Sequence, residues 1–304
     1  MVRKIEIDDI EQVLGFEIDE MVKDKVRQFD MSYVELSKEE RDGVVMGILS
    51  KLDEDIVYSG KHRLQDWERG WGENLQQFKD KDEVSSLIPR YHGKYDIIRW
   101  KGDFVRTESP DVDYKLHICL VDSILNKYIK DGDSVFEFGC GPGYHLLRFS
   151  DYRKVSLFGG DWTRASQSII SDINEKFDLG IKPFNFDFFN PDYTIVVPDE
   201  SVFYTVAALE QVGENFKSFV DFIIEKNPRL VINMEPIDEL LDSEKLVDYL
   251  SIKYFRKRNY LNGYLPYLEK LESEGRIEIL RKQRINYGSL YVEGHSLIVW
   301  RPKK

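Results

Sequence analysis

Apolar and polar residues follow one another along most of the chain in the order expected of strands that alternate with helices. Five short apolar runs predict buried parallel strands: 135–138, 154–158, 184–187, 201–208 and 230–234. Four amphipathic stretches predict helices around them: 114–129, 144–149, 164–177 and 265–274. Two further runs predict a closing antiparallel pair of strands: 276–284 and 296–300.

The first third of the chain shows helical spacing without intervening strands. Apolar residues between Ile10 and Val26 approximate one helical face, and Ser37 with Glu40 resembles a capping box before a second helix. Large apolar residues continue this spacing in 67–78, although two glycines there weaken a continuous helix. The pattern predicts a mainly helical cap or substrate lid over residues 1–108, next to a second domain over 109–304.

Composition and charge narrow the class of protein. A chain of 304 residues with 42% hydrophobic content can bury a full core, and its net charge of −12 argues against a general nucleic-acid binder. No apolar run approaches the roughly 18 residues that span a bilayer, and the N-terminus lacks the apolar core of a signal peptide. We therefore expect a cytoplasmic protein that binds neither nucleic acid nor membrane.

Cysteine and histidine give no metal signature. Cys119 and Cys140 lie outside metal-type and redox-type spacings, so we expect neither a disulfide nor a reactive thiol. The five histidines are scattered at positions 62, 92, 117, 145 and 295. Because no short motif gathers them, we expect no metal site.

The strongest chemical signal is the stretch 135–143, Val-Phe-Glu-Phe-Gly-Cys-Gly-Pro-Gly. Gly139, Gly141 and Gly143 lie on a predicted strand-to-helix turn, where missing side chains let the backbone bend and approach a ligand closely. The spacing is G-x-G-x-G, whereas dinucleotide-binding turns carry G-x-G-x-x-G. Glu137 would repel a pyrophosphate but could pair with a cation. The motif therefore favours a cationic ligand that carries a ribose, such as S-adenosylmethionine, over NAD.

This stretch resembles the first motif of the class I (Rossmann-like) S-adenosylmethionine-dependent methyltransferases, an acidic residue followed by x-G-x-G-x-G. The resemblance covers about residues 110 to 304. It implies an α/β fold, with a mostly parallel sheet that ends in an antiparallel hairpin and follows an N-terminal helical extension. It also implies S-adenosylmethionine as cofactor and S-adenosylhomocysteine as product.

Two further acidic residues fit a cofactor site. Asp161 follows the second predicted strand about 20 residues after the glycine turn, the offset at which an acid meets ribose hydroxyls, and Trp162 lies beside it. As an alternative, Asp161 caps the helix over 164–177. The resemblance places Asp187 at the adenine amino group with Phe186 or Phe188 beside the ring; as an alternative, Asp187 is a solvated turn residue.

Two glutamates that follow parallel strands are the candidates for catalysis. We predict Glu235 as the general base, because Pro236 restricts the chain directly after it, although Glu235 could instead cap a helix that begins at Pro236. Glu210 is the second candidate base and could also orient cofactor or substrate. His145 and His117 follow as weaker candidates.

Aromatic and cationic residues in two segments could hold the substrate. The segment 91–106 contributes Tyr91, Arg99 and Trp100, and a second group after the fourth and fifth strands contributes Gln211, Arg256 and Tyr260. Core packing of the aromatics and a solvated helix end for the cations remain the alternatives.

The residues after the fourth strand narrow the choice of methyl acceptor. Ala208-Leu-Glu-Gln differs from the Asn-Pro-Pro-Tyr motif of methyltransferases that act on bases or amides, and the Glu-Gln and Glu-Pro-Ile pattern is similar to that of uncharacterised bacterial methyltransferases. We predict methylation of a small molecule, on the oxygen of a sugar or secondary metabolite. The alternatives are a protein or peptide N-methyltransferase and a non-catalytic S-adenosylmethionine-binding protein. A homodimer stays open.

Overall fold

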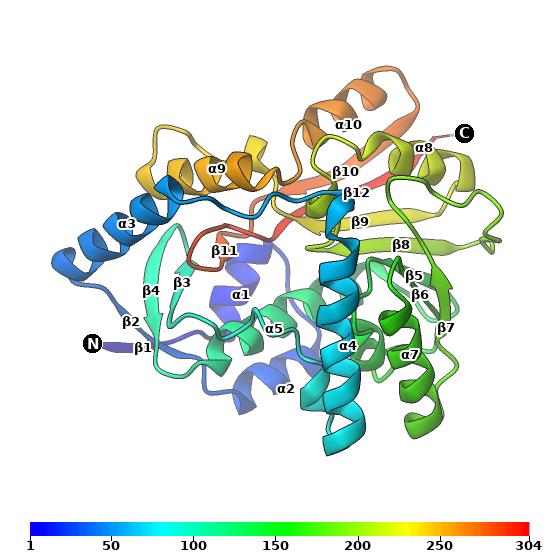
Figure 1. The fold of residues 1–304 in the computed structure, drawn as a ribbon, viewed down its shortest axis with the longest axis horizontal. Helices are drawn as coiled ribbons and strands as arrows, with labels where there is room; N and C mark the ends of the chain where they lie inside the picture. The colour runs from blue at the N-terminus through cyan, green and yellow to red at the C-terminus, as the bar shows by residue number, and fades with distance from the viewer. Residues whose placement is uncertain (304) are drawn as a thin grey trace.

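A computed structural model describes residues 1–303, and a twisted seven-stranded sheet runs through its centre (Figure 1). Along the sheet the strands are β10 (Ile277–Gln283), β12 (Ser296–Pro302), β9 (Leu230–Glu235), β8 (Ser201–Val206), β5 (Ser134–Phe138), β6 (Ser156–Asp161) and β7 (Lys182–Asn185). The five strands from β9 to β7 are parallel. Strand β12 is antiparallel to both of its neighbours. The predicted class I methyltransferase fold is therefore confirmed.

Alternation along the central strand explains how the helices cover the sheet. In β5, Phe136 and Phe138 face a cluster that contains α8 (Lys217–Lys226) and α10 (Tyr264–Ser273). Val135 faces the other cluster, which contains α5 (Asp111–Tyr128), α6 (Tyr144–Phe149) and α7 (Arg164–Phe177). Because successive side chains of a strand point to opposite faces, Glu137 lies on the α5 and α6 side.

The predicted elements agree with the structure except near two strand ends. Helices α6 and α7 have the predicted bounds. Strand β7 ends at Asn185, so Asp187 lies in the turn that follows it. The predicted helix after Pro236 is wrong, because the chain forms only the short 3-10 helix η4 (Asp238–Leu240) there.

The N-terminal region contains strands that the sequence pattern does not predict. They are β1 (Val2–Lys4), β2 (Ser32–Glu35), β3 (Ile97–Trp100) and β4 (Asp103–Thr107). With β11 (Tyr287–Gly288) they form a second sheet in the order β1-β2-β4-β3-β11. Since β11 comes from the far end of the chain, this sheet joins the two regions; the division at residue 108 stays a prediction.

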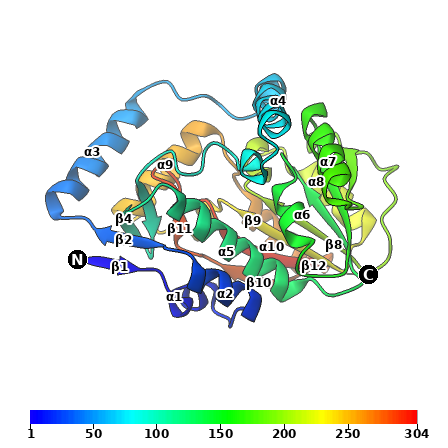
Figure 2. The ribbon, with the colours of Figure 1, turned by 90° about the horizontal axis from the view of Figure 1, so that it is seen from below.

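The helices of this region are α1 (Ile7–Leu14), α2 (Glu20–Gln28), α3 (Lys38–Asp53) and α4 (Leu64–Lys81). They lie at different places around the central sheet: in Figure 2, α1 and α2 are at the bottom, α4 is at the top and α3 is at the upper left. The predicted capping box before α3 is confirmed. Helix α4 lies beside α7, and the Glu68 carboxylate accepts hydrogen bonds from the first backbone N–H groups of α7, at Arg164 (2.8 Å) and Ala165 (3.0 Å). Within residues 1–303, no helix is both long and apolar enough to cross a bilayer.

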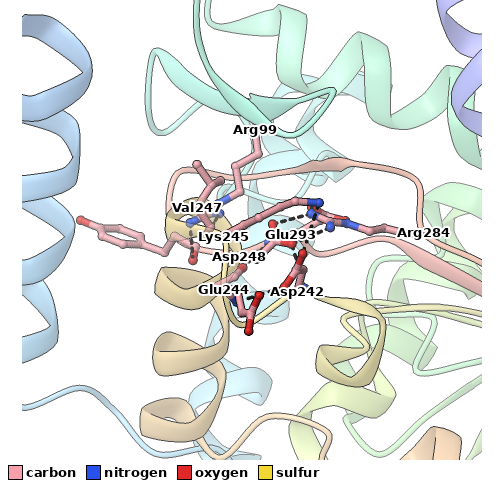
Figure 3. Close-up of polar contacts among 10 residues, drawn as sticks. Arg99, Asp242, Glu244, Lys245, Val247, Asp248, Arg284 and Glu293 are labelled. Atoms are coloured by element: carbon pink, nitrogen blue, oxygen red, sulfur yellow. Dashed lines mark hydrogen bonds and ion pairs between the residues drawn. The ribbon is translucent and has the colours of Figure 1, made fainter. Parts of the chain in front are cut away.

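A buried ionic cluster ties α9 (Leu246–Arg258) to the chain before β12 (Figure 3). The Arg284 guanidinium donates two hydrogen bonds of 2.6 Å to Asp248 and two of 2.5 Å to Glu293. Both carboxylate side chains are only 2% exposed, and Arg284 is the cation paired with both of them. The backbone N–H of Asp242 also donates to Asp248, at 2.9 Å. The cluster therefore fixes the loop that carries Tyr291 and His295 to the cavity at the strand ends.

We expect Arg284→Met to lower the free energy of unfolding by about 3 to 5 kcal/mol, because two buried carboxylates lose their partner. Urea denaturation measures this difference. The matched control is Arg301→Met, which removes an exposed pair with Glu278 and should cost less than about 1 kcal/mol. Equal losses in the two variants would contradict the structural role assigned to the cluster.

Candidate functional site

A cavity of about 430 Å³ opens at the carboxyl ends of β5, β6 and β8, where open α/β sheets bind ligands. The glycine turn forms one wall, and the chain between β8 and α8 forms another. Trp67 and Trp71 of α4 and Tyr91 and His92 of the following loop close the third side. The N-terminal region therefore supplies part of the site.

The glycine turn adopts the strained backbone that its sequence predicts. Gly139, Gly141 and Gly143 have φ of 74°, 49° and 67°, which residues with a side chain rarely adopt. A Cβ on Gly139 would lie 2.4 Å from the Cβ of Ala208, and one on Gly141 would lie 2.8 Å from the Trp71 ring. Glycine is required here both by conformation and by space.

Asp161 lies in the cavity wall but already has partners. One carboxylate oxygen accepts from the backbone N–H of Gly141 at 3.0 Å, and the other accepts from the N–H and hydroxyl of Thr163 at 2.9 and 2.7 Å. Asp161 therefore links the glycine turn to the start of α7 by hydrogen bonds. Its predicted contact with ribose stays a prediction, and such a contact would share these oxygens.

Among the predicted adenine-side residues, the aromatic side chains of Phe186 and Phe188 line the cavity, as does Trp162, whereas Asp187 does not. The Trp162 and Phe189 rings are stacked, with 6.1 Å between their centroids. The Phe188 ring lies next to the position that a Cβ on Gly139 would take. The Asp187 carboxylate accepts from the N–H of Phe189 at 2.9 Å and lies 3.5 Å from the Lys61 ammonium group. Their roles stay predictions, but their positions form one aromatic pocket next to the glycine turn.

Glu137 is 1% exposed, and both of its oxygens are paired. It accepts hydrogen bonds from Nδ1 of His145 at 2.8 Å and from the Tyr204 hydroxyl at 2.9 Å. The predicted pairing of Glu137 with a cationic cofactor is untested; in the structure this carboxylate holds α6 and β8 against β5.

Glu235 lies away from the cavity. It is fully buried and accepts from the backbone N–H groups of Ala208, Leu209 and Glu210 at 3.1 to 3.2 Å. These groups begin the short 3-10 helix η3 (Leu209–Val212). Glu235 therefore positions the loop after β8. The role of general base for Glu235 stays a prediction, which this position away from the cavity does not favour.

Glu210 and its neighbour Gln211 do line the cavity. The Glu210 carboxyl accepts from the Gln211 amide at 2.7 Å. Burial first, and the nearby Glu235 second, raise the pKa of Glu210 to about 8. Burial also raises the pKa of Glu235 to about 7. Of the two, only Glu210 lines the cavity, and a carboxyl with a pKa near neutral can donate or accept a proton there.

The predicted substrate residues divide into two groups. Tyr91, Gln211 and Tyr260 line the cavity. Arg99, Trp100 and Arg256 do not line it. Their contact with substrate stays a prediction, which this cavity does not support.

Each of the three has another environment. Arg99 is 1% exposed and donates to the carbonyl oxygens of Val247 (2.6 Å) and Tyr291 (3.3 Å), as part of the anchored region in Figure 3. Trp100 is buried in the core, and Arg256 is exposed on α9. The pattern of aromatic and cationic residues in the sequence could not distinguish positions in the cavity wall from those in the core or on the surface. For Arg99 and Trp100, the reason is that β3 was not predicted.

Four histidines meet at the cavity, although their spacing in the sequence gave no sign of it. His92, His117, His145 and His295 all line it, and each comes from a different segment. Nε2 of His117 lies 3.1 Å from Nε2 of His145, and the His117 ring centre lies 4.5 Å from that of His92 and 4.9 Å from that of His295. No three metal-ligating side chains among residues 1–303 are arranged to hold a metal ion.

Comparisons with known proteins bear on the fold alone. No family model and no curated protein matches the chain in sequence. Similar solved structures include magnesium protoporphyrin IX methyltransferase (ChlM) from Synechocystis PCC 6803, at 11% identity and a TM-score of 0.47 over 63% of this chain and 84% of that chain. The small RNA methyltransferase HEN1 is 14% identical with a TM-score of 0.45, over 63% of this chain and 25% of that chain.

A third similar structure is a pericyclic reaction enzyme, at 9% identity and a TM-score of 0.42 over 62% of this chain. The chain spans about half of that enzyme's length, 52%. All three TM-scores lie below 0.5, so the class I methyltransferase fold of this chain stands on the strand order and the antiparallel β12 of the molecule itself.

We expect Glu235→Gln to destabilise the protein by about 1 to 3 kcal/mol, since an amide cannot serve all three backbone donors as a carboxylate does. Thermal and urea denaturation measure the loss. Glu225→Gln, on the exposed face of α8, is the matched control and should change stability little. An unchanged stability in Glu235→Gln would restore a chemical role for this residue.

The raised pKa of Glu210 predicts how stability depends on pH. Between its ordinary value of 4.5 and about 8, the folded state binds more protons at this group than the unfolded state, so stability falls as pH rises through that window. Glu210→Gln should flatten this dependence. Urea denaturation at several pH values tests it, and an unchanged slope in the variant would show that Glu210 is not responsible.

Proposed function

We propose that this protein is an S-adenosylmethionine-dependent methyltransferase that acts on a small-molecule acceptor. The observation that carries the proposal is the glycine turn, whose left-handed Gly139 and Gly141 line a cavity at the carboxyl ends of the parallel strands. At about 430 Å³ the cavity has the size of small-molecule sites in proteins.

The residues present fit the cofactor. Glu137 and Asp161 place two carboxylates at the turn, which suits a ligand with a positive charge. Phe188, together with Phe189, offers an aromatic surface for a purine ring on the far side of Gly139. When bound, S-adenosylmethionine would supply the methyl group; the chain's part is to hold the acceptor in line and exclude water.

The acceptor side favours a compact, partly aromatic or hydroxylated molecule. Beyond Glu210, the wall contains Tyr91, Tyr254, Tyr260 and Tyr291, which offer aromatic faces and hydroxyl groups. The α4 helix and the loop after it cover the cavity, and such a cover suits a small acceptor better than a chain that must pass through the site. Methylation of an oxygen stays our preferred reaction.

Calorimetry tests the cofactor. We expect S-adenosylhomocysteine to bind one molecule per chain and NAD not to bind. Gly141→Ala forces a left-handed backbone and a contact with Trp71, and should weaken S-adenosylhomocysteine at least about tenfold, or about 1.4 kcal/mol. Gly47→Ala on α3, where a Cβ meets nothing within 4 Å, is the control. Binding of NAD instead would overturn the proposal.

Turnover tests the reaction. S-adenosylmethionine labelled on its methyl group would be incubated with a panel of small hydroxyl, amine and thiol compounds, and with a basic peptide. We expect label in a small hydroxyl compound. Transfer to the peptide alone would replace the proposed acceptor class by a protein or peptide substrate.

A further inference from the structure

The histidine cluster contains a hydrogen-bonded chain with a fixed direction. A carboxylate only accepts, so Nδ1 of His145 carries the hydrogen that it shares with Glu137 at 2.8 Å. In a neutral ring, Nε2 of His145 then has a lone pair. Nε2 of His117, at 3.1 Å, must therefore be the donor between the two rings.

This direction leaves one nitrogen free to accept a proton. Nδ1 of His117 is buried and has no hydrogen-bond partner among residues 1–303, and it carries a lone pair because Nε2 holds the hydrogen. His117 is 3% exposed and lines the cavity. A buried polar atom without a partner needs an explanation, and a proton donor in the cavity would supply one.

The surroundings decide where a positive charge can rest. Burial first, and then His92 and His295, hold the pKa of His117 well below its usual range. Burial lowers the pKa of His295 to about 3. A charge on His145 would instead lie 2.8 Å from the Glu137 carboxylate. The charge is therefore more stable at the Glu137 end of the chain.

Charged and titratable groups face the two rings from every element packed against them. They are His92 and Asp113 beside His117, Arg148 and Tyr144 on α6, Glu137 on β5, Tyr204 on β8, Tyr287 on β11 and His295 before β12. Among them, only Glu137 is an acid in direct contact with either of the two rings.

We propose that His117 and His145 form a proton path: His117 takes the proton lost by the acceptor and passes its other proton to His145, which lies beside Glu137. This inference rests on the proposed function. As the acceptor's nucleophile forms its bond to the methyl carbon and the carbon–sulfur bond breaks, its proton goes to Nδ1 of His117. The Nε2 proton of His117 moves to Nε2 of His145. After the step, His117 is a neutral ring and His145 is an imidazolium beside Glu137. The positive charge of the sulfonium is now on this imidazolium.

The roles within the path differ. His117 is the catalytic residue, because it takes the proton from the acceptor. His145, Glu137 and Tyr204 are positioning residues, since they orient the path and stabilise its end. Neither Glu235, which is outside the cavity, nor Glu210 is needed as the base.

The first experiment is ¹⁵N NMR of protein labelled on histidine, without cofactor or acceptor. With five histidines the signals are few, and exposed His62 serves as reference. At neutral pH we expect His145 as the Nδ1–H tautomer and His117 as the Nε2–H tautomer. His117 as the Nδ1–H tautomer would overturn the path, as would stoichiometric Zn²⁺ binding to either ring.

The second experiment uses His117→Gln, whose side-chain N–H can still donate to His145 but whose amide cannot take up a proton. With the hydroxyl acceptor found by the labelled-methyl assay, kcat should fall about 10²- to 10⁴-fold. The same acceptor as a thiol analogue, which ionises more readily, should lose far less. S-adenosylhomocysteine affinity, measured by calorimetry, should stay within about twofold, whereas failure of the wild type to bind it would overturn the proposed function itself. Near-normal kcat in a variant that binds S-adenosylhomocysteine would overturn the proton path and leave the function standing.

Discussion

The carboxylate of Glu137 is the constraint on which the site depends. It lies 1% exposed inside the sheet, directly before the glycine turn, so its two oxygens must find donors within the protein. His145 of α6 and Tyr204 of β8 provide them. One buried acid thereby fixes the angle at which α6 leaves the turn, the contact of β5 with β8, and the tautomer of the first histidine in the cluster.

A second constraint is the close approach of neighbouring segments to the turn. The backbone at Gly139 and Gly141 passes so near Ala208 and Trp71 that no side chain fits. Trp71 belongs to α4, and Glu68 on the same helix caps α7. The N-terminal region is therefore built into the wall of the cavity, and β11 ties it to the C-terminal segment that carries His295.

Local pattern was sufficient to predict the fold of the second region. The apolar runs, the glycines and the helical spacing of α6 and α7 each reflect interactions within a few residues. The mostly parallel sheet with a closing antiparallel hairpin followed from the resemblance. The N-terminal strands β1 to β4 were missed because each is only three to five residues long. Their pairing partners lie far away in sequence, including Tyr287 and Gly288 for β3, and so leave no periodic signal.

The same limit explains which site residues could be predicted. Those in the glycine turn and directly after β6 and β8 lie in the cavity wall because strand ends meet at one edge. Glu235 also ends a strand, but its side chain turns toward the backbone N–H groups of the neighbouring loop, a contact that depends on the three-dimensional path of Ala208 to Glu210. Position at a strand end therefore predicts nearness to the site, not the direction of a side chain.

The histidines show the opposite case. Each is unremarkable in its own segment, and 203 residues separate the first from the last member of the cluster, His92 and His295. Only the packing of α5 on β5, with the β3 and β11 pairing beside it, brings them together. Three buried ring nitrogens, Nδ1 of His117 and both nitrogens of His295, lack partners within residues 1–303, while Glu137 and Asp113 each hold one ring by its Nδ1. In this cluster, carboxylates hold two of the rings in one orientation and leave other ring nitrogens free. Packing alone does not require this arrangement, and the arrangement gives the proton path its direction.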